Sequence, residues 1–311
     1  MKLKKMPKWQ RRVLVYKLFG RLPYGNRLFD LVRATVGLNR NFDISRRHYS
    51  IVEMSDMLAQ AGKSVEGKQL VEIGAGWHPV LPALFYGMGA ARIVITDIVK
   101  HIQQSYVEQT LDYLIAHADE IAQTVGVPAN QLSTRWQTLH PKGKAWDRVW
   151  HTQGIHYDAP FNFMETRWPA NSVDMIYSNS CISYIPFSTL KKIFQESVRI
   201  LKPGGWIAHN LMPYDDYASN DASITPLNFL RYDAKTWEQI GNCALHYQNR
   251  CRPADYLKLA ERYGLRVLFS KRRQHHLSVT MLDRHQLDAA FRDLSEEELL
   301  CAHFSIVAEK A

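Results

Sequence analysis

Residues 70–98, LVEIGAGWHPVLPALFYGMGAARIVITDI, place two glycines directly after one apolar run and an acid directly after a second. Both runs are short, and the second is rich in Ile and Val, which is typical of strands buried on both faces of a parallel sheet. The segment between them carries Leu81, Leu84 and Phe85 on one side of a predicted helix. The stretch therefore predicts a β-α-β unit and an α/β fold for the chain around it.

The glycines and the acid have a specific meaning in such a unit. Glycines after the first strand let the backbone approach a ligand at the helix N-terminus, and an acid after the second strand accepts hydrogen bonds from a ribose. Gly74, Gly76 and Asp97 stand at these positions. Pro79 replaces the third glycine of the dinucleotide fingerprint, which disfavours NAD. A nucleoside-bearing cofactor is expected, although a plain tight turn and an Asp97 cap on a helix beginning near Ile98 stay open as alternatives.

Glu72 stands two residues before Gly74, at the carboxyl end of the first strand. The run from Glu72 to Gly76 resembles the first motif of the class I S-adenosylmethionine-dependent methyltransferases, acid-x-Gly-x-Gly-x-Gly, with His78 at the third glycine. The resemblance implies a Rossmann-like domain with a seven-stranded, mostly parallel sheet flanked by helices, as in the type 11-like methyltransferases. It also implies S-adenosyl-L-methionine as the cofactor and S-adenosyl-L-homocysteine as its product.

Later stretches resemble the same family in the same order. GIHYDAP at residues 154–160 resembles the third strand, and WPANSVDMIYSNSCISYIP at residues 168–186 resembles the fourth. Residues 188–210 resemble a helix opened by Ser188 as its N-cap, a Pro-Gly-Gly turn and the fifth strand. The cofactor-binding residues implied by the resemblance are Glu72, Gly74, Ala75, Gly76, Asp97, Ile98, Asp158, Ala159, Ser178 and Asn179. Asp158 as ordinary turn chemistry, and Ser178 and Asn179 as a plain strand end, remain alternatives.

Two regions exceed what a minimal domain of this kind needs, at about residues 101–147 and 211–252. The first is largely helical by its pattern and lies between the second and third strands. The second follows the fifth strand and stands over the carboxyl edge of the sheet, where open α/β sheets bind ligands. We expect it to be a substrate lid. The candidate substrate-binding residues are Tyr184, Tyr214, Asn228, Arg231, Tyr247 and Arg250.

Methyl transfer to a hydroxyl needs in-line positioning and a base that removes the proton. His209, at the end of the fifth strand, is the expected base, and Asp216 is expected to orient it or to replace it. A structural His209 and a solvated Asp216 are the alternatives. The lid resembles those of methyltransferases encoded near polysaccharide-synthesis genes, without fixing a substrate.

The acceptor atom follows only by elimination. The chain reads Ser178-Asn179-Ser180-Cys181 after the fourth strand, where many amino-group methyltransferases carry an Asn/Asp-Pro-Pro-aromatic tetrad. The four cysteines form no CxxC pair, so we expect no metal. The sequence therefore favours O-methylation of a small-molecule or glycan-like metabolite, with N-methylation next.

The net charge of +9 is concentrated near the N-terminus. Residues 1–50 hold 13 Lys/Arg against two Asp, a charge of +11, which leaves about −2 for the rest of the chain. The near-neutral body of the chain disfavours nucleic acid as a partner. The alternative functions are an RNA methyltransferase that uses the basic N-terminus and an inactive cofactor-binding scaffold. The oligomeric state is not predicted.

The basic segment itself has the pattern of an amphipathic helix. Trp9, Val13, Tyr16 and Leu18 recur at roughly helical spacing. We expect a helical extension over residues 1–60, capping a methyltransferase domain over 61–311 and leaving peripheral membrane contact open. No apolar run reaches the roughly 20 residues that span a bilayer, so a cytoplasmic protein is expected. His275 and His276, in a basic run, are expected at the surface.

Overall fold

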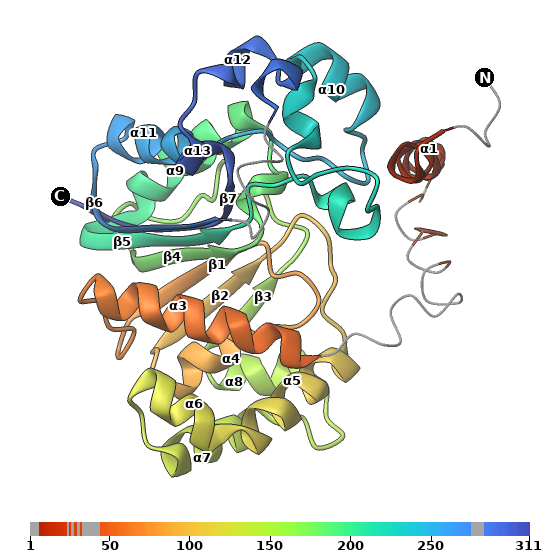
Figure 1. The fold of residues 1–311 in the computed structure, drawn as a ribbon. Coiled ribbons are helices and arrows are strands. Elements are labelled where there is room, and N and C mark those ends of the chain that lie inside the picture. Colours follow the sequence, from red (N-terminus) through yellow and green to blue (C-terminus); the bar gives the residue numbers. More distant parts are fainter. Residues whose placement is uncertain (1–5, 24, 26–27, 30–31, 33–43, 275–282) are drawn as a thin grey trace.

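The computed structural model describes the 311-residue chain except residues 1–5, 24, 26–27, 30–31, 33–43 and 275–282. Seven strands form one sheet in the order β3-β2-β1-β4-β5-β7-β6 (Figure 1). The strands are β1 (Gln69–Ile73), β2 (Arg92–Thr96), β3 (Ile155–Asp158), β4 (Val173–Asn179), β5 (Leu201–Leu211), β6 (Leu265–Gln274) and β7 (Cys301–Lys310). The first five pair in parallel, and β7 pairs antiparallel with both β5 and β6. The predicted seven-stranded, mostly parallel sheet is confirmed.

Helices cover both faces of this sheet (Figure 1). One apolar cluster joins the sheet to α3 (His48–Gln60), α4 (Val80–Gly87) and α5 (Gln104–Ala116), and a second joins the opposite face to α9 (Phe187–Ile200) and α11 (Pro253–Arg262). Helix α3 thus belongs to the main core, although the predicted extension included it. The carboxyl ends of β1 to β5 are left as the shared edge for ligands.

The two insertions have different places in the fold. The first forms α5, α6 (Ala118–Val125), α7 (Ala129–Leu139) and α8 (Trp146–Thr152). It is a structural layer on α4, since the indole N–H of Trp136 donates to the Ala83 carbonyl over 2.8 Å.

The second insertion forms η4 (Asp216–Asn220), η5 (Asn228–Arg231) and α10 (Ala234–Ile240). It shares a third apolar cluster with α1 (Lys8–Gly20) and with the segment that holds η7 (Arg284–Gln286), α12 (Ala289–Arg292) and α13 (Glu296–Leu299). The inward residues of α1 are Trp9, Val13 and Tyr16. Leu18, predicted on the same side, is 56% exposed, because at 100° per residue it lies about 180° from Trp9 on the helix.

Two local predictions were wrong. Helix α9 begins at Phe187 with Pro186 as its N-cap, and Ser188 makes no cap hydrogen bond. The proline ring holds its own backbone extended just before the helix, so the helix starts two residues earlier than expected. The Pro-Gly-Gly sequence at 203–205 lies within β5 as an irregularity, where the register with β4 shifts between Val173 and Met175. His275 and His276 lie outside the described residues.

Candidate active site

The glycine loop leaves β1 and is tied to the end of β2. Gly74 and Gly76 have φ angles of +80° and +62°, which favour glycine. The N–H groups of Gly74 and Ala75 donate to the Thr96 carbonyl over 2.9 and 3.2 Å. The Gly76 N–H donates to Asp97 Oδ2 over 3.1 Å. These hydrogen bonds fix the glycine loop to the end of β2 and to Asp97, the residue that follows it.

Asp97 caps no helix. Its Oδ1 accepts a hydrogen bond from the Val99 N–H over 3.1 Å, and the next helix begins only at Gln104, so the capping alternative was wrong. Ile98 is 78% exposed beside it. Asp158 ends the neighbouring strand in register with Thr96, also exposed, and Ala159 follows it. Ile98 is thus exposed at the sheet edge where the backbone N–H of Asp97 donates to the Asp158 carbonyl over 3.3 Å.

The space around the loop is suited to a ligand. A Cβ atom at Gly76 would meet nothing within 4 Å, whereas one at Gly74 would lie 2.2 Å from the Cys181 sulfur. Glu72 is 4% exposed, and its Oε2 has no hydrogen-bond partner. Burial, and then the nearby Asp97 carboxylate, raise the pKa of Glu72 well above its usual value. A ligand with an amino group, a ribose and a flat base would fit this edge, since it would complete the hydrogen bonding of Glu72 and cover the exposed Ile98.

Sequence reasoning missed Arg47, which ends η2 (Ile44–Arg47). Burial lowers the pKa of its guanidinium, while the charges of Glu72 and Tyr184 raise it. Its guanidinium is therefore close enough to both Glu72 and Tyr184 to interact with their charges. Nothing in the sequence marks it, because it stands far before the glycine motif in a segment rich in cations.

The end of β4 and β5 forms a buried polar layer. Ser178 is fully buried, and its hydroxyl lies 2.8 Å from Nδ1 of His209. His209 is 1% exposed with its ring near Phe194 of α9, and burial lowers its pKa to about 3. Asn179 donates to the Ser50 hydroxyl of α3 over 3.0 Å. In this arrangement Ser178, Asn179 and His209 tie neighbouring elements together beneath the site.

A polar cluster stands above the edge instead. Tyr184 ends η3 (Ile182–Tyr184), and its backbone N–H donates to the Cys181 carbonyl over 2.9 Å. Cys181 is the residue whose side chain lies against Gly74. The His246 ring lies 5.9 Å from the Tyr184 ring, and its Nε2 lies 4.0 Å from Asp216 Oδ2. The structure therefore brings the predicted Tyr184 and Asp216 together around a histidine that was not predicted.

Burial and neighbouring charges shift the pKa values of His246 and Tyr184 in this cluster. Burial lowers the pKa of His246, the Asp216 carboxylate raises it, and the Arg12 guanidinium lowers it. Burial, followed by Asp216 and Tyr214, raises the pKa of Tyr184. At neutral pH the imidazole is thus largely uncharged and the Tyr184 phenol keeps its proton.

The other predicted substrate residues are mainly part of the lid framework. Asn228 is buried and donates to Asp215 Oδ2 over 2.9 Å. Arg250 donates to the carbonyl of Tyr232, and its guanidinium lies over the Phe291 ring. Arg231 is exposed, and Tyr247 is half-buried.

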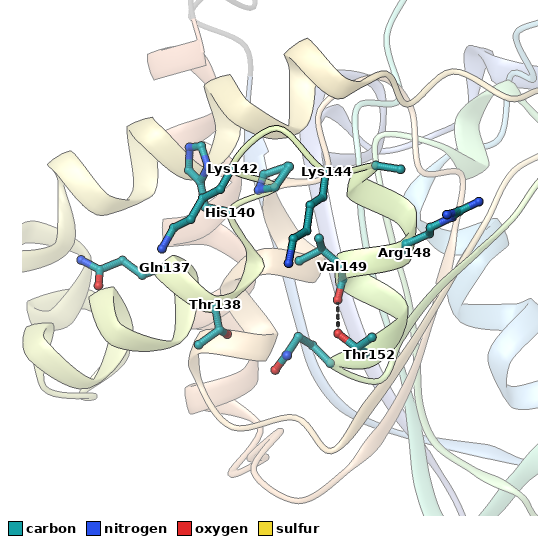
Figure 2. A pocket seen from close by; sticks show the side chains of 11 residues that line it. Gln137, Thr138, His140, Lys142, Lys144, Arg148, Val149 and Thr152 are labelled. Atoms are coloured by element: carbon teal, nitrogen blue, oxygen red, sulfur yellow. Dashed lines mark hydrogen bonds between the residues drawn. The ribbon is translucent and has the colours of Figure 1, made fainter.

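A separate hollow of about 610 Å³ lies between α7 and α8 (Figure 2). Lys142, Lys144 and Arg148 line it, and it contains none of the predicted site residues. Across the described part of the chain, no group of three or more His, Cys, Asp or Glu could hold a metal ion.

Comparison with known proteins adds a family match. A family model described as "Methyltransferase domain" matches residues 139–209, which run from the end of α7 to His209 in β5.

Solved structures with similar folds include an S-adenosylmethionine-dependent methyltransferase from Mesorhizobium loti. It is 14% identical with a TM-score of 0.43, and the match covers 82% of this chain and 98% of that one. Another is geranyl diphosphate C-methyltransferase from Streptomyces coelicolor, in complex with Mg²⁺, geranyl diphosphate and S-adenosyl-L-homocysteine. It is 11% identical with a TM-score of 0.43, over 83% of this chain and 78% of that one.

The segment that the domain model matches contains β3, β4 and most of β5, in the same sheet as the glycine loop that follows β1. The unpartnered Glu72 Oε2, the open space at Gly76 and the carboxylate of Asp97 would suit the amino group and ribose of S-adenosylmethionine. Residues 139–209 of this chain thus match a methyltransferase domain, within a seven-stranded Rossmann-like sheet.

Proposed function

We propose that this chain is a class I S-adenosylmethionine-dependent methyltransferase that acts on a hydroxyl group of a small-molecule or glycan-like acceptor, with His246 as the general base. The observation that carries the proposal is the Asp216–His246 pair next to Tyr184, one short turn from the residue that covers Gly74. Bound S-adenosylmethionine supplies an electrophilic methyl group on its sulfonium. The residues of the cluster would position the acceptor and accept the proton of its hydroxyl group.

The acceptor oxygen forms a bond to the methyl carbon as the carbon–sulfur bond breaks, and the hydroxyl proton passes to the His246 imidazole. An uncharged imidazole can accept this proton, and the Asp216 carboxylate, 4.0 Å away, stabilises the cation that results. Tyr184 keeps its phenolic proton and can donate a hydrogen bond that orients the acceptor.

This proposal keeps Asp216 from the sequence prediction and moves the base from His209 to His246. His209 is 1% exposed and its ring faces α9, so an acceptor above the sheet edge does not reach it in this conformation. His246 is on the lid and faces Tyr184. The His209–Ser178 pair then serves as a support beneath the cofactor site.

A test uses S-adenosylmethionine labelled with tritium in its methyl group and a panel of hydroxylated acceptors: free sugars, glycosides and simple phenols. Amino sugars and amino acids form the amine arm of the panel, and bulk RNA forms a third arm. Wild type is compared with His246→Asn and with His285→Asn, a control in which an exposed histidine is lost. We expect labelled product from the hydroxyl arm, with a loss of about 10²–10⁴-fold for His246→Asn only.

The other outcomes identify the alternatives. Transfer confined to amines would show N-methylation, and transfer confined to RNA would show the nucleic-acid reaction. Full activity of His246→Asn on a hydroxyl would remove His246 as the base. Binding of S-adenosylhomocysteine without transfer to any arm would favour a cofactor-binding scaffold.

One observation weighs against the nucleic-acid alternative. The basic run on β6 is neutralised by ion pairs: Lys271 with Asp56 over 2.9 Å and Arg272 with Glu298 over 2.9 Å. Cations that are already paired with carboxylates contribute less to phosphate binding.

A further inference from the structure

Helix α1 has two apolar sides, of which only one is covered. Trp9, Val13 and Tyr16 are buried against the lid. The opposite side exposes Leu14, Val15, Leu18 and, just after the helix, Leu22, with exposed fractions of 41 to 56%. A second, exposed apolar side on a short helix indicates a surface that binds another partner.

Cations are interleaved with these exposed apolar residues. Lys8, Arg11 and Arg21 are exposed on the same outer side, and residues 6–23 contain no acid. The preceding residues 1–5 add three lysines in sequence. An apolar strip edged by Lys and Arg, without carboxylates, is complementary to the surface of an anionic lipid bilayer.

The inner side fixes α1 to the catalytic part of the molecule. The backbone N–H of Trp9 donates to Asp221 Oδ2 over 2.9 Å, and the Trp9 ring stacks on the Trp237 ring with centroids 6.1 Å apart. The Tyr16 ring lies 5.7 Å from the His246 ring. The helix therefore forms a wall of the acceptor cluster with one side while its other side is exposed.

We propose that the outer side of α1, formed by Leu14, Val15, Leu18 and Leu22 with Lys8, Arg11 and Arg21, docks reversibly on an anionic membrane surface. No described helix is long and apolar enough to cross a membrane, so this contact lies in the interface. Docking would place the acceptor cluster beside the headgroup layer. If the proposed function holds, on which this last step rests, the acceptor is presented at the membrane surface.

The test is co-sedimentation of the full chain with vesicles, which requires no acceptor and so is independent of the reaction. Vesicles of phosphatidylcholine with about one quarter phosphatidylglycerol are compared with phosphatidylcholine alone. Leu14→Glu/Leu18→Glu places two charges on the outer side. Val52→Glu/Met164→Glu is the matched control, since both residues are apolar, exposed and outside α1. Titration with S-adenosylhomocysteine checks that each variant retains its cofactor site.

We expect wild type and the control to bind the anionic vesicles about tenfold more strongly than the neutral ones, and to be released at high salt. The Leu14→Glu/Leu18→Glu variant should lose about tenfold in binding while it still binds S-adenosylhomocysteine. Equal binding by all three proteins, or no binding of wild type to anionic vesicles, overturns the proposal. A wild-type dimer in sedimentation velocity that becomes a monomer in Leu14→Glu/Leu18→Glu also overturns it, because the outer side would then join two copies of the chain.

Discussion

The backbone N–H of Gly76 donates a hydrogen bond of 3.1 Å to the carboxylate of Asp97. One side chain therefore ends β2, holds the glycine loop in place and stands where a cofactor ribose would bind. Asp97→Ala should weaken the binding of S-adenosylhomocysteine by about 1.5–3 kcal/mol, roughly 10- to 150-fold in Kd. Isothermal titration calorimetry measures this loss. Asp147→Ala, on the exposed surface of α8, is the control and should leave Kd unchanged.

The open space at Gly76 can be tested against a glycine of similar conformation. Gly76 and Gly126 have φ angles of +62° and +69°, and a Cβ atom at either would meet nothing within 4 Å. Alanine at each position should cost a similar amount of stability, about 1 kcal/mol, from the backbone alone. Only Gly76→Ala should weaken binding of S-adenosylhomocysteine, by fivefold or more, because the methyl group occupies the ligand space. Equal Kd values for the two variants would contradict the assigned cradle.

The pH dependence of methyl transfer should report His246. Protonated imidazole accepts no proton, so kcat/KM should fall as the pH drops through the pKa of His246, which burial lowers below its usual 6.5. The Asp216 charge raises that pKa, so Asp216→Asn should move the acidic limb to lower pH as well as slow the reaction. The measurement is a pH–rate profile with an acceptor from the hydroxyl panel. An acidic limb that Asp216→Asn leaves in place would assign the titration to another group.

Acid stability should depend on His209. Its pKa is about 3 in the fold against 6.5 as the usual value, so between these values the unfolded chain binds more protons than the native one. The stability that this group contributes is complete above pH 6.5 and is lost as the pH falls towards 3. Across this pH range the contribution of His209 to the free energy of unfolding changes by roughly 3–5 kcal/mol. His209→Gln, which keeps a polar partner for Ser178, should flatten the free energy of unfolding against pH, measured by urea denaturation. His285→Gln should retain the wild-type slope.

The packing of α1 against the lid should stabilise the lid. Trp9 is 2% exposed within an aromatic cluster, so Trp9→Ala should cost the lid about 3–5 kcal/mol in local stability. Hydrogen exchange of residues 214–249, followed by mass spectrometry, should accelerate. Leu18→Ala, on the outer side of the same helix, should change exchange by less than about 0.5 kcal/mol. Unchanged exchange in Trp9→Ala would mean that the lid folds without α1.

The features around the cofactor were readable from the sequence because they are local. The run from Glu72 to Gly76 and the acid at Asp97 each follow a strand directly, and parallel strands bring their carboxyl ends to one edge. Short-range spacing therefore predicts long-range proximity in this part of the fold. Asp97 and Ile98 stand at that edge as the pattern indicated, and Asp158 ends the adjacent strand.

The acceptor side could not be read in this way. His246, Asp216 and Tyr16 come from three separate segments, and nothing in their spacing indicates that they meet. Arg47 was missed for the same reason. These contacts depend on how an irregular lid and an N-terminal helix pack together.

The sequence by itself determined the parallel sheet, the glycine loop and the acid that follows the second strand. Hydrophobic runs and glycines act on their immediate neighbours, so their consequences are visible in the chain order. Only the tertiary structure decided which histidine lies beside Tyr184 and Asp216. Both faces of β5 are covered by helices, so the alternation of its side chains turns His209 into the core against α9, while the packing of the lid on α1 carries His246 to Tyr184.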